Sequence, residues 1–163
     1  TIGSVLMKRR RITAAAVSMA AVCCLGASSA MADDAADVIA AAKAQWAAGI
    51  SMASAAKQME TVADDYTEFN PVYPTRIDGK ALNMTLAEAA LKDGAKTIAS
   101  EMANEKVQIY GDTAILTYNY IGVGQSKDGV NEPIAAKSTR VYVKQNGKWM
   151  LVHANFAPVA MPD

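Results

Sequence analysis

The spacing of apolar residues changes along the chain from a helical period to a strand-like period. In the first part, apolar residues recur every three or four positions, which predicts helices. Asp33 and Asp34 place acidic side chains at the start of the first helix, where the helix dipole favours them, and Gly49 follows its end. The predicted helices cover residues 33–49, 52–63 and 85–91, the last opened by a capping box at Thr85 and ended by Gly94.

Strand-like alternation of polar and apolar residues appears first in segment 64–73, where Pro71 and Pro74 end the strand or confine it to a sheet edge. A turn is expected at 76–80. From residue 96 onward the alternation is almost continuous and predicts an antiparallel meander, with a hairpin loop centred on Asp128-Gly129 and a tight turn at Asn146-Gly147. Its strands cover 96–111, which is irregular or bulged, then 112–126, 136–145 and 148–158. Helices first and antiparallel strands afterwards indicate an α+β fold, with helices covering one face of a curved sheet.

The first 32 residues carry the pattern of a secretory signal peptide. A basic cluster, Lys8–Arg11, follows Met7, and an apolar run extends from Ile12 to Ala27. The run is too short and too rich in alanine for a membrane span, and Ala30-Met31-Ala32 forms an A-x-A exit. We therefore expect cleavage after Ala32. The mature protein would be a single domain of residues 33–163, periplasmic or secreted and without a membrane anchor, and residues 1–6 would lie upstream of the leader.

Charge and cysteine content exclude several classes of function for the mature chain. The sequence has 16 Lys and Arg against 16 Asp and Glu, and removal of the basic leader leaves an acidic protein. This balance disfavours nucleic acid and anionic membranes as partners. Cys23 and Cys24 both lie in the leader, so we expect no disulfide, no thiolate catalysis and no cysteine–metal site. With one histidine and no phosphate-binding loop, neither a metal nor another cofactor is expected.

The closing hairpin, residues 138–158, carries a recognisable set of short motifs. They are Ser-Thr-Arg-Val-Tyr at 138–142, Asn-Gly-Lys-Trp at 146–149, Val-His at 152–153 and Phe-Ala-Pro at 156–158. These motifs resemble the association domain of calcium/calmodulin-dependent protein kinase II and its bacterial relatives. The corresponding motifs of that family are approximately T-R-V-W, D-G-K-W and V-H-x-H-x-S. These domains belong to the wider nuclear-transport-factor-two-like and SnoaL-like superfamily.

The resemblance implies a cone-shaped α+β fold, in which a bent antiparallel sheet wraps around a long helix and leaves a pocket between them. It also implies homodimers or larger rings that form through the sheet. The kinase domain itself has no counterpart in this chain. Asn155 stands where the family has a second histidine, and Ala157 stands where it has a serine, so a role that needs those groups is not transferred.

Three polar residues of the hairpin are candidate ligand contacts. Strand alternation places His153 and Asn155 on the same face as Leu151, where they form either a pocket wall or an exposed or subunit-facing surface. Arg140, by resemblance, points into the pocket, where its guanidinium could hold a carboxylate in a bidentate manner. The alternative is a solvated arginine, paired with an acid or placed at a subunit contact.

Aromatic residues elsewhere are candidate pocket walls. Tyr118 shares a strand face with Leu116, Tyr66 lies on the short early strand, and Trp46 lies on the first helix. Each of them is also compatible with simple core packing.

These observations lead to three hypotheses about function. The first is an exported domain that binds a small, acidic organic molecule, forms homo-oligomers, or does both. The second is a ketosteroid-isomerase-like or SnoaL-like enzyme that uses His153 or Asp65 as general base. The third is an oligomerisation scaffold without a ligand.

Overall fold

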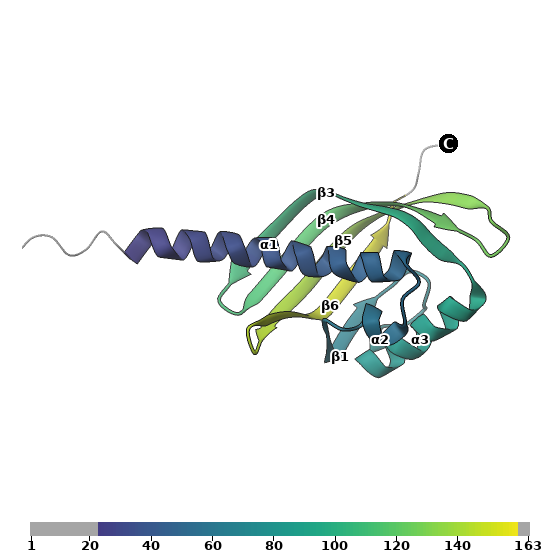
Figure 1. Cartoon of the computed structure of the whole chain (residues 1–163), viewed down its shortest axis with the longest axis horizontal. Helices are drawn as coiled ribbons and strands as arrows, with labels where there is room; N and C mark the ends of the chain where they lie inside the picture. The colour runs from purple at the N-terminus through teal and green to yellow at the C-terminus, as the bar shows by residue number, and fades with distance from the viewer. Residues whose placement is uncertain (1–22, 160–163) are drawn as a thin grey trace, which may run out of the picture.

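The computed structural model describes the backbone of residues 23–159 and the side chains of residues 33–159 (Figure 1). The basic cluster and the start of the apolar run of the predicted signal peptide lie outside the described residues. Within the described part, no helix is both long and apolar enough to cross a membrane.

The first predicted helix is confirmed, and it begins earlier than the sequence pattern indicates. Helix α1 extends from Cys23 to Ile50 and lies across the inner face of the sheet (Figure 1). Val38 and Ala42 are both 0 % exposed, because they are one helical turn apart and face the strands together.

The second predicted helix is wrong over most of its length. Only α2, Ala55–Gln58, is helical, and the hydroxyl of Ser54 caps it by accepting the amide N–H of Lys57. Val62, predicted to be helical, opens strand β1, Val62–Phe69, and lies beside Leu151 of strand β6, Lys148–Pro158. Pairing with a distant strand overrides the local helical period of this segment.

The third helix, α3, covers Lys80–Asp93 and ends at Gly94 in the left-handed conformation, as predicted. Its predicted start is wrong, because Gly79, not Thr85, is the N-cap residue. The Thr85 hydroxyl instead donates to the carbonyl of Ala81, one turn back inside the helix.

The sheet has six strands in the order β2-β1-β6-β5-β4-β3. The remaining strands are β2, Ile77–Asp78; β3, Lys96–Tyr110; β4, Thr113–Gln125; and β5, Asn131–Gln145. All neighbours are antiparallel except β1 and β6, which are parallel. The curved sheet carries the helices on one face (Figure 1), which confirms the α+β prediction.

The meander follows the sequence pattern, except that β5 begins at Asn131, before the predicted start at 136. Asn146 and Gly147 both have positive φ, of 51° and 77°, so the tight turn between β5 and β6 is of the type that matches the twist of the strands. The predicted bulges in β3 are present as register shifts, between Thr97 and Ala99 and between Ala103 and Lys106.

The hydrophobic core lies between the inner face of the sheet and α1. It combines small helix residues with large strand residues, which interdigitate. Its largest fully buried side chains are Tyr142, Leu116, Leu151, Val38 and Val62.

Candidate functional site

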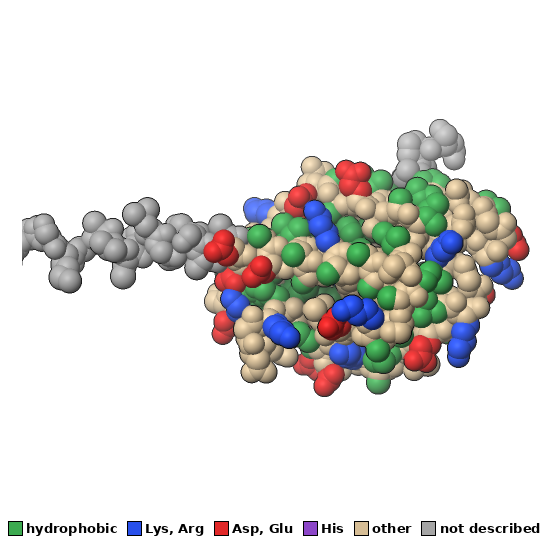
Figure 2. Space-filling model, in the orientation of Figure 1, with side chains coloured by type: hydrophobic (Ala, Val, Ile, Leu, Met, Phe, Trp, Pro, Cys, Tyr) green, Lys and Arg blue, Asp and Glu red, His purple; other side chains and the backbone are tan. Residues whose placement is uncertain are grey.

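A cavity of about 770 Å³ lies beyond the core, between the inner face of the sheet, the C-terminal end of α1 and helix α3. Apolar side chains make up most of its wall. On the face of the molecule that carries α1, apolar side chains reach the surface between scattered charged ones (Figure 2).

Small inward-facing residues leave room for this cavity. Gly122 and Gly124 follow Tyr120 on the inner face of β4, and Ala136 is opposite Tyr120 on β5. A Cβ atom on Gly122 would lie 2.6 Å from the Tyr120 hydroxyl oxygen and 2.9 Å from the backbone carbonyl oxygen of Ala99, so this position favours glycine.

Arg140 is at the inner end of the cavity and is only 5 % exposed. Its Nε donates to the hydroxyl oxygen of Tyr118 at 2.9 Å, and its Nη1 donates to the side-chain carbonyl of Gln45. The guanidinium carbon lies 5.9 Å from the ring centroid of Trp46 and 5.7 Å from that of Phe156. These contacts orient the guanidinium and remove it from water, but all four partners are neutral.

Arg140 therefore has no acidic partner within the described residues. The ion pairs found there are Lys57–Glu60, Arg76–Asp78 and Lys144–Asp34. A guanidinium has five N–H donors and remains protonated in proteins. A buried cation of this kind is costly unless an anion meets it, so the inner end of the cavity is suited to a negatively charged group.

A second polar cluster surrounds Glu68, which is 8 % exposed. Its Oε2 accepts hydrogen bonds from the Tyr66 hydroxyl at 2.7 Å and from Asn83 Nδ2 at 3.0 Å, and its Oε1 accepts one from Asn70 Nδ2 at 2.7 Å. Burial and the adjacent carboxylate raise the pKa of Tyr66. Tyr66, expected to be a pocket wall, thus belongs to this cluster, which joins β1 to α3, and is not among the residues that line the cavity.

His153 and Asn155 lie on the outer face of the sheet, away from the cavity. The register of β5 and β6 shifts between Val141 and Tyr142: Tyr142 is opposite Leu151, and Val141 is opposite His153. This bulge inserts one extra residue in β6, so His153 no longer shares a face with Leu151. The prediction that the two polar residues form a pocket wall is therefore wrong.

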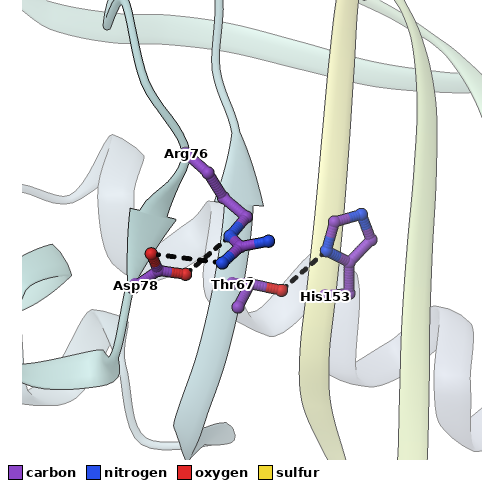
Figure 3. A network of polar contacts seen from close by, with 4 residues as sticks. All are labelled: Thr67, Arg76, Asp78 and His153. Carbon is purple, nitrogen blue, oxygen red and sulfur yellow. Dashed lines mark hydrogen bonds and ion pairs between the residues drawn. The ribbon is translucent and has the colours of Figure 1, made fainter.

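The surroundings of His153 are formed by strands β1 and β2. Its Nδ1 lies 2.8 Å from Oγ1 of Thr67, and its ring centroid lies 6.0 Å from that of Phe69. Figure 3 shows the His153 ring turned toward Thr67, with the ion pair between Arg76 and Asp78 on the other side of the threonine.

The structure therefore brings Trp46, Tyr118 and Arg140 together at the cavity and leaves the other three predicted residues outside it. Sequence reasoning missed Gln45 and Phe156. Gln45 directly precedes Trp46 on the first helix, and this position is a sequence signal that Gln45 also reaches the cavity. The bulge in β6 places Phe156 on the same face as Leu151, where it meets Arg140, and this bulge leaves no trace in the sequence pattern.

Neither residue proposed as a general base reaches the cavity. His153 is on the outer face, and Asp65 is exposed on β1 and does not line the cavity. Within residues 33–159, no three histidine or acidic residues gather closely enough to hold a metal ion.

The outer face of β4, β5 and β6 is the second candidate surface. Its residues are mainly aliphatic or β-branched and half-buried. The helices pack on the opposite face, so no helix covers these side chains in the described part of the chain. The central positions are Ile115, Thr117, Thr139, Val141 and Val143.

A family comparison identifies a match that covers nearly all of the described chain. The family model of the calcium/calmodulin dependent protein kinase II association domain matches residues 34–160. No curated protein sequence matches the chain significantly.

Several solved structures share the fold. The calcium/calmodulin-dependent protein kinase II hub homology domain of Chlamydomonas reinhardtii has a TM-score of 0.65 and 22 % identity, covering 78 % of this chain and 99 % of its own. An NTF2-like protein with a cystatin-like fold from Novosphingobium aromaticivorans has a TM-score of 0.70 and 15 % identity, covering 89 % of this chain and 94 % of its own. A ketosteroid isomerase-like protein from Erwinia carotovora has a TM-score of 0.66 and 21 % identity, covering 78 % of this chain and 98 % of its own. At these identities the similarity demonstrates the fold.

Proposed function

Because the chain belongs to the calcium/calmodulin dependent protein kinase II association domain family, we propose that it is a self-associating domain whose cavity binds a small organic acid. The apolar outer face of the sheet supports self-association. The buried Arg140 supports the binding of an acid.

Self-association is supported by the chemistry of the outer face. Antiparallel sheets with one solvated face normally place polar residues there, whereas this face places Ile115 and Val141 side by side at its centre. Contiguous apolar surface on a soluble protein marks an interaction site. A second copy of the same face would be complementary to it about a two-fold axis. Light scattering combined with native mass spectrometry tests this proposal, and a monomer at micromolar concentration would contradict it.

Acid binding is supported by Arg140, whose charge lies at the inner end of the cavity without a carboxylate partner among the described residues. Carboxylates pair with guanidinium groups through two parallel hydrogen bonds, and Tyr118 and Gln45 hold this guanidinium in place. A panel of carboxylates in a thermal-shift assay, with the wild type and Arg140→Gln compared, tests this part. Equal shifts in the two proteins would contradict it.

We do not extend the proposal to catalysis. An isomerase of this fold class needs a base within hydrogen-bond reach of the substrate. The two residues proposed as the base, His153 and Asp65, are not among the residues that line the cavity.

We also propose that the protein is exported and begins at Asp33 after cleavage. Asp34 is the first residue with a described tertiary contact: its carboxylate accepts hydrogen bonds from Lys144 and from the Trp149 indole. Cleavage after Ala32 would preserve these contacts and remove only residues before the family match. N-terminal sequencing of the protein recovered from the periplasm of a bacterial host would reveal Asp33 if this is correct, and Met7 if it is not.

A further inference from the structure

We propose that the acid bound in the cavity is a fatty acid, that is, a monocarboxylate with a long unbranched apolar chain. This inference rests on the proposed function of acid binding and specifies its ligand class. The carboxylate would meet Arg140 at the inner end, and the chain would extend along β5 toward the rim.

The inner end has the donors that a carboxylate needs. Arg140 uses one N–H on Tyr118 and one on Gln45, and the Tyr142 side chain also interacts with the guanidinium. With five N–H donors, the guanidinium retains donors for a ligand. The Tyr118 hydroxyl accepts from Arg140 and retains its own proton for donation. The inner end of the cavity is thus rich in donors, and no acidic side chain lies there.

Between Arg140 and the rim the cavity is long and mainly apolar. On β5 its lining runs from Arg140 through Ala136 and Ile134 to Glu132, a path of roughly 26 Å at about 3.3 Å per residue. Phe156 and Leu91 face it from β6 and α3. An acid of two to four carbons would leave most of this wall facing water, whereas an extended alkyl chain would cover it.

The size of the cavity agrees with such an occupant. Its volume of about 770 Å³ lies toward the upper end of the 300–1,000 Å³ that is typical of small-molecule sites. Ile134 is 40 % exposed and Val72 is 77 % exposed at the rim, and both line the cavity. These exposed apolar side chains would contact the outer part of the chain. Besides Arg140, the charged residues of the lining are Lys96, at the start of β3, and Glu132, near the start of β5.

Chain length is the first experimental variable. Binding of acetate, butyrate, hexanoate, octanoate and decanoate is measured by calorimetry on the mature protein, with decylamine as the matched cation. Each added methylene should tighten binding by up to about fourfold, and decylamine should not bind. If butyrate binds through Arg140 as tightly as decanoate, the fatty-acid inference is overturned and acid binding survives. If no acid binds in an Arg140-dependent manner, both proposals fail.

The orientation of the bound fatty acid is the second variable. The fluorescence of Trp46 reports it, because the Trp46 ring lies beside the Arg140 guanidinium. Trp149→Phe removes the other tryptophan, which is outside the cavity. Bromine quenches a tryptophan that it contacts. We expect 2-bromododecanoate to quench Trp46 more strongly than 12-bromododecanoate. The reverse order, or equal quenching, would contradict a carboxylate at Arg140.

A pair of matched variants tests the path of the chain. Ile134→Asp places a charge at the outer end of the cavity, whereas Ile98→Asp changes a similarly exposed isoleucine, at 38 %, that does not line the cavity. Ile134→Asp should weaken decanoate binding more than tenfold and leave butyrate binding unchanged, and Ile98→Asp should affect neither. Equal effects of the two substitutions on decanoate binding would overturn the proposed path.

Discussion

The Nδ1 atom of His153 lies 2.8 Å from the hydroxyl oxygen of Thr67, across the parallel pair of strands β6 and β1 and on the outer face of the sheet. The contact ties the C-terminal strand to the first strand of the fold. It also places the histidine on the surface through which self-association is proposed, beside Val141.

A charge at the centre of the outer face should disrupt the oligomer. Val141→Asp places a carboxylate next to Ile115, and an unpaired charge in an apolar interface costs several kcal/mol, on the order of 2–5. Light scattering should detect a monomer. Leu82→Asp, at an exposed apolar position of α3, should remain oligomeric. Dissociation of both variants would point to a different interface.

Arg140 should control acid binding more than stability. Arg140→Gln removes the charge and one or more hydrogen bonds to the ligand, so affinity for carboxylates should fall more than about tenfold. Arg140→Lys should not restore it, because lysine lacks the planar fork. Calorimetry measures the binding, and chemical unfolding should show a loss of about 1–3 kcal/mol from the unpaired Tyr118 and Gln45.

A control for Arg140 is Lys144→Gln, which removes a cation outside the cavity. Carboxylate affinity should be unchanged in this variant. A parallel loss of affinity in both variants would indicate that net charge, not the geometry at Arg140, governs binding.

Glu68 should be important for stability. Glu68→Ala removes a buried acceptor from Tyr66, Asn70 and Asn83 and leaves their donors unpaired, which should cost about 2–4 kcal/mol of unfolding free energy. Glu60→Ala is the control, because Glu60 is an exposed acid whose ion pair with Lys57 should contribute little. Urea unfolding measures both variants. A similarly small effect of Glu68→Ala would mean that water replaces the carboxylate.

The contact between Asp34 and Lys144 should make stability depend on pH. The hydrogen bond from Lys144 lowers the pKa of Asp34 below its usual 3.8, so the stabilisation is present above that value and is lost as the pH falls through the lowered pKa. The same bond raises the pKa of Lys144 above 10.5, so the stabilisation is also lost in strong alkali. Asp34→Asn should have a lower urea midpoint than the wild type at pH 7. The two midpoints should converge in strong acid, and a constant difference would contradict the assignment.

Much of the fold was predictable because local physics determines it. The Asn146-Gly147 turn, the alternation of the long strands and the end of α3 at Gly94 each depend on residues close in sequence. Tyr118 lies on the predicted face of β4 for the same reason, because the strand keeps a strict two-residue period. The assignment of Arg140 to the cavity came from the family resemblance.

The sequence by itself therefore determined the class of the fold and its closing hairpin, which follow from local periods and turn chemistry, and it indicated the family through the motifs of that hairpin. Only the tertiary structure decided three further points. Val62 lies in a strand because it pairs with Leu151, and α3 begins after Gly79, whose amide N–H donates to the carbonyl of Tyr66 in β1. The bulge near Val152 moved His153 to the outer face, because one extra residue inverts every position that follows it. Such choices depend on partners far away in sequence, which a local pattern does not contain.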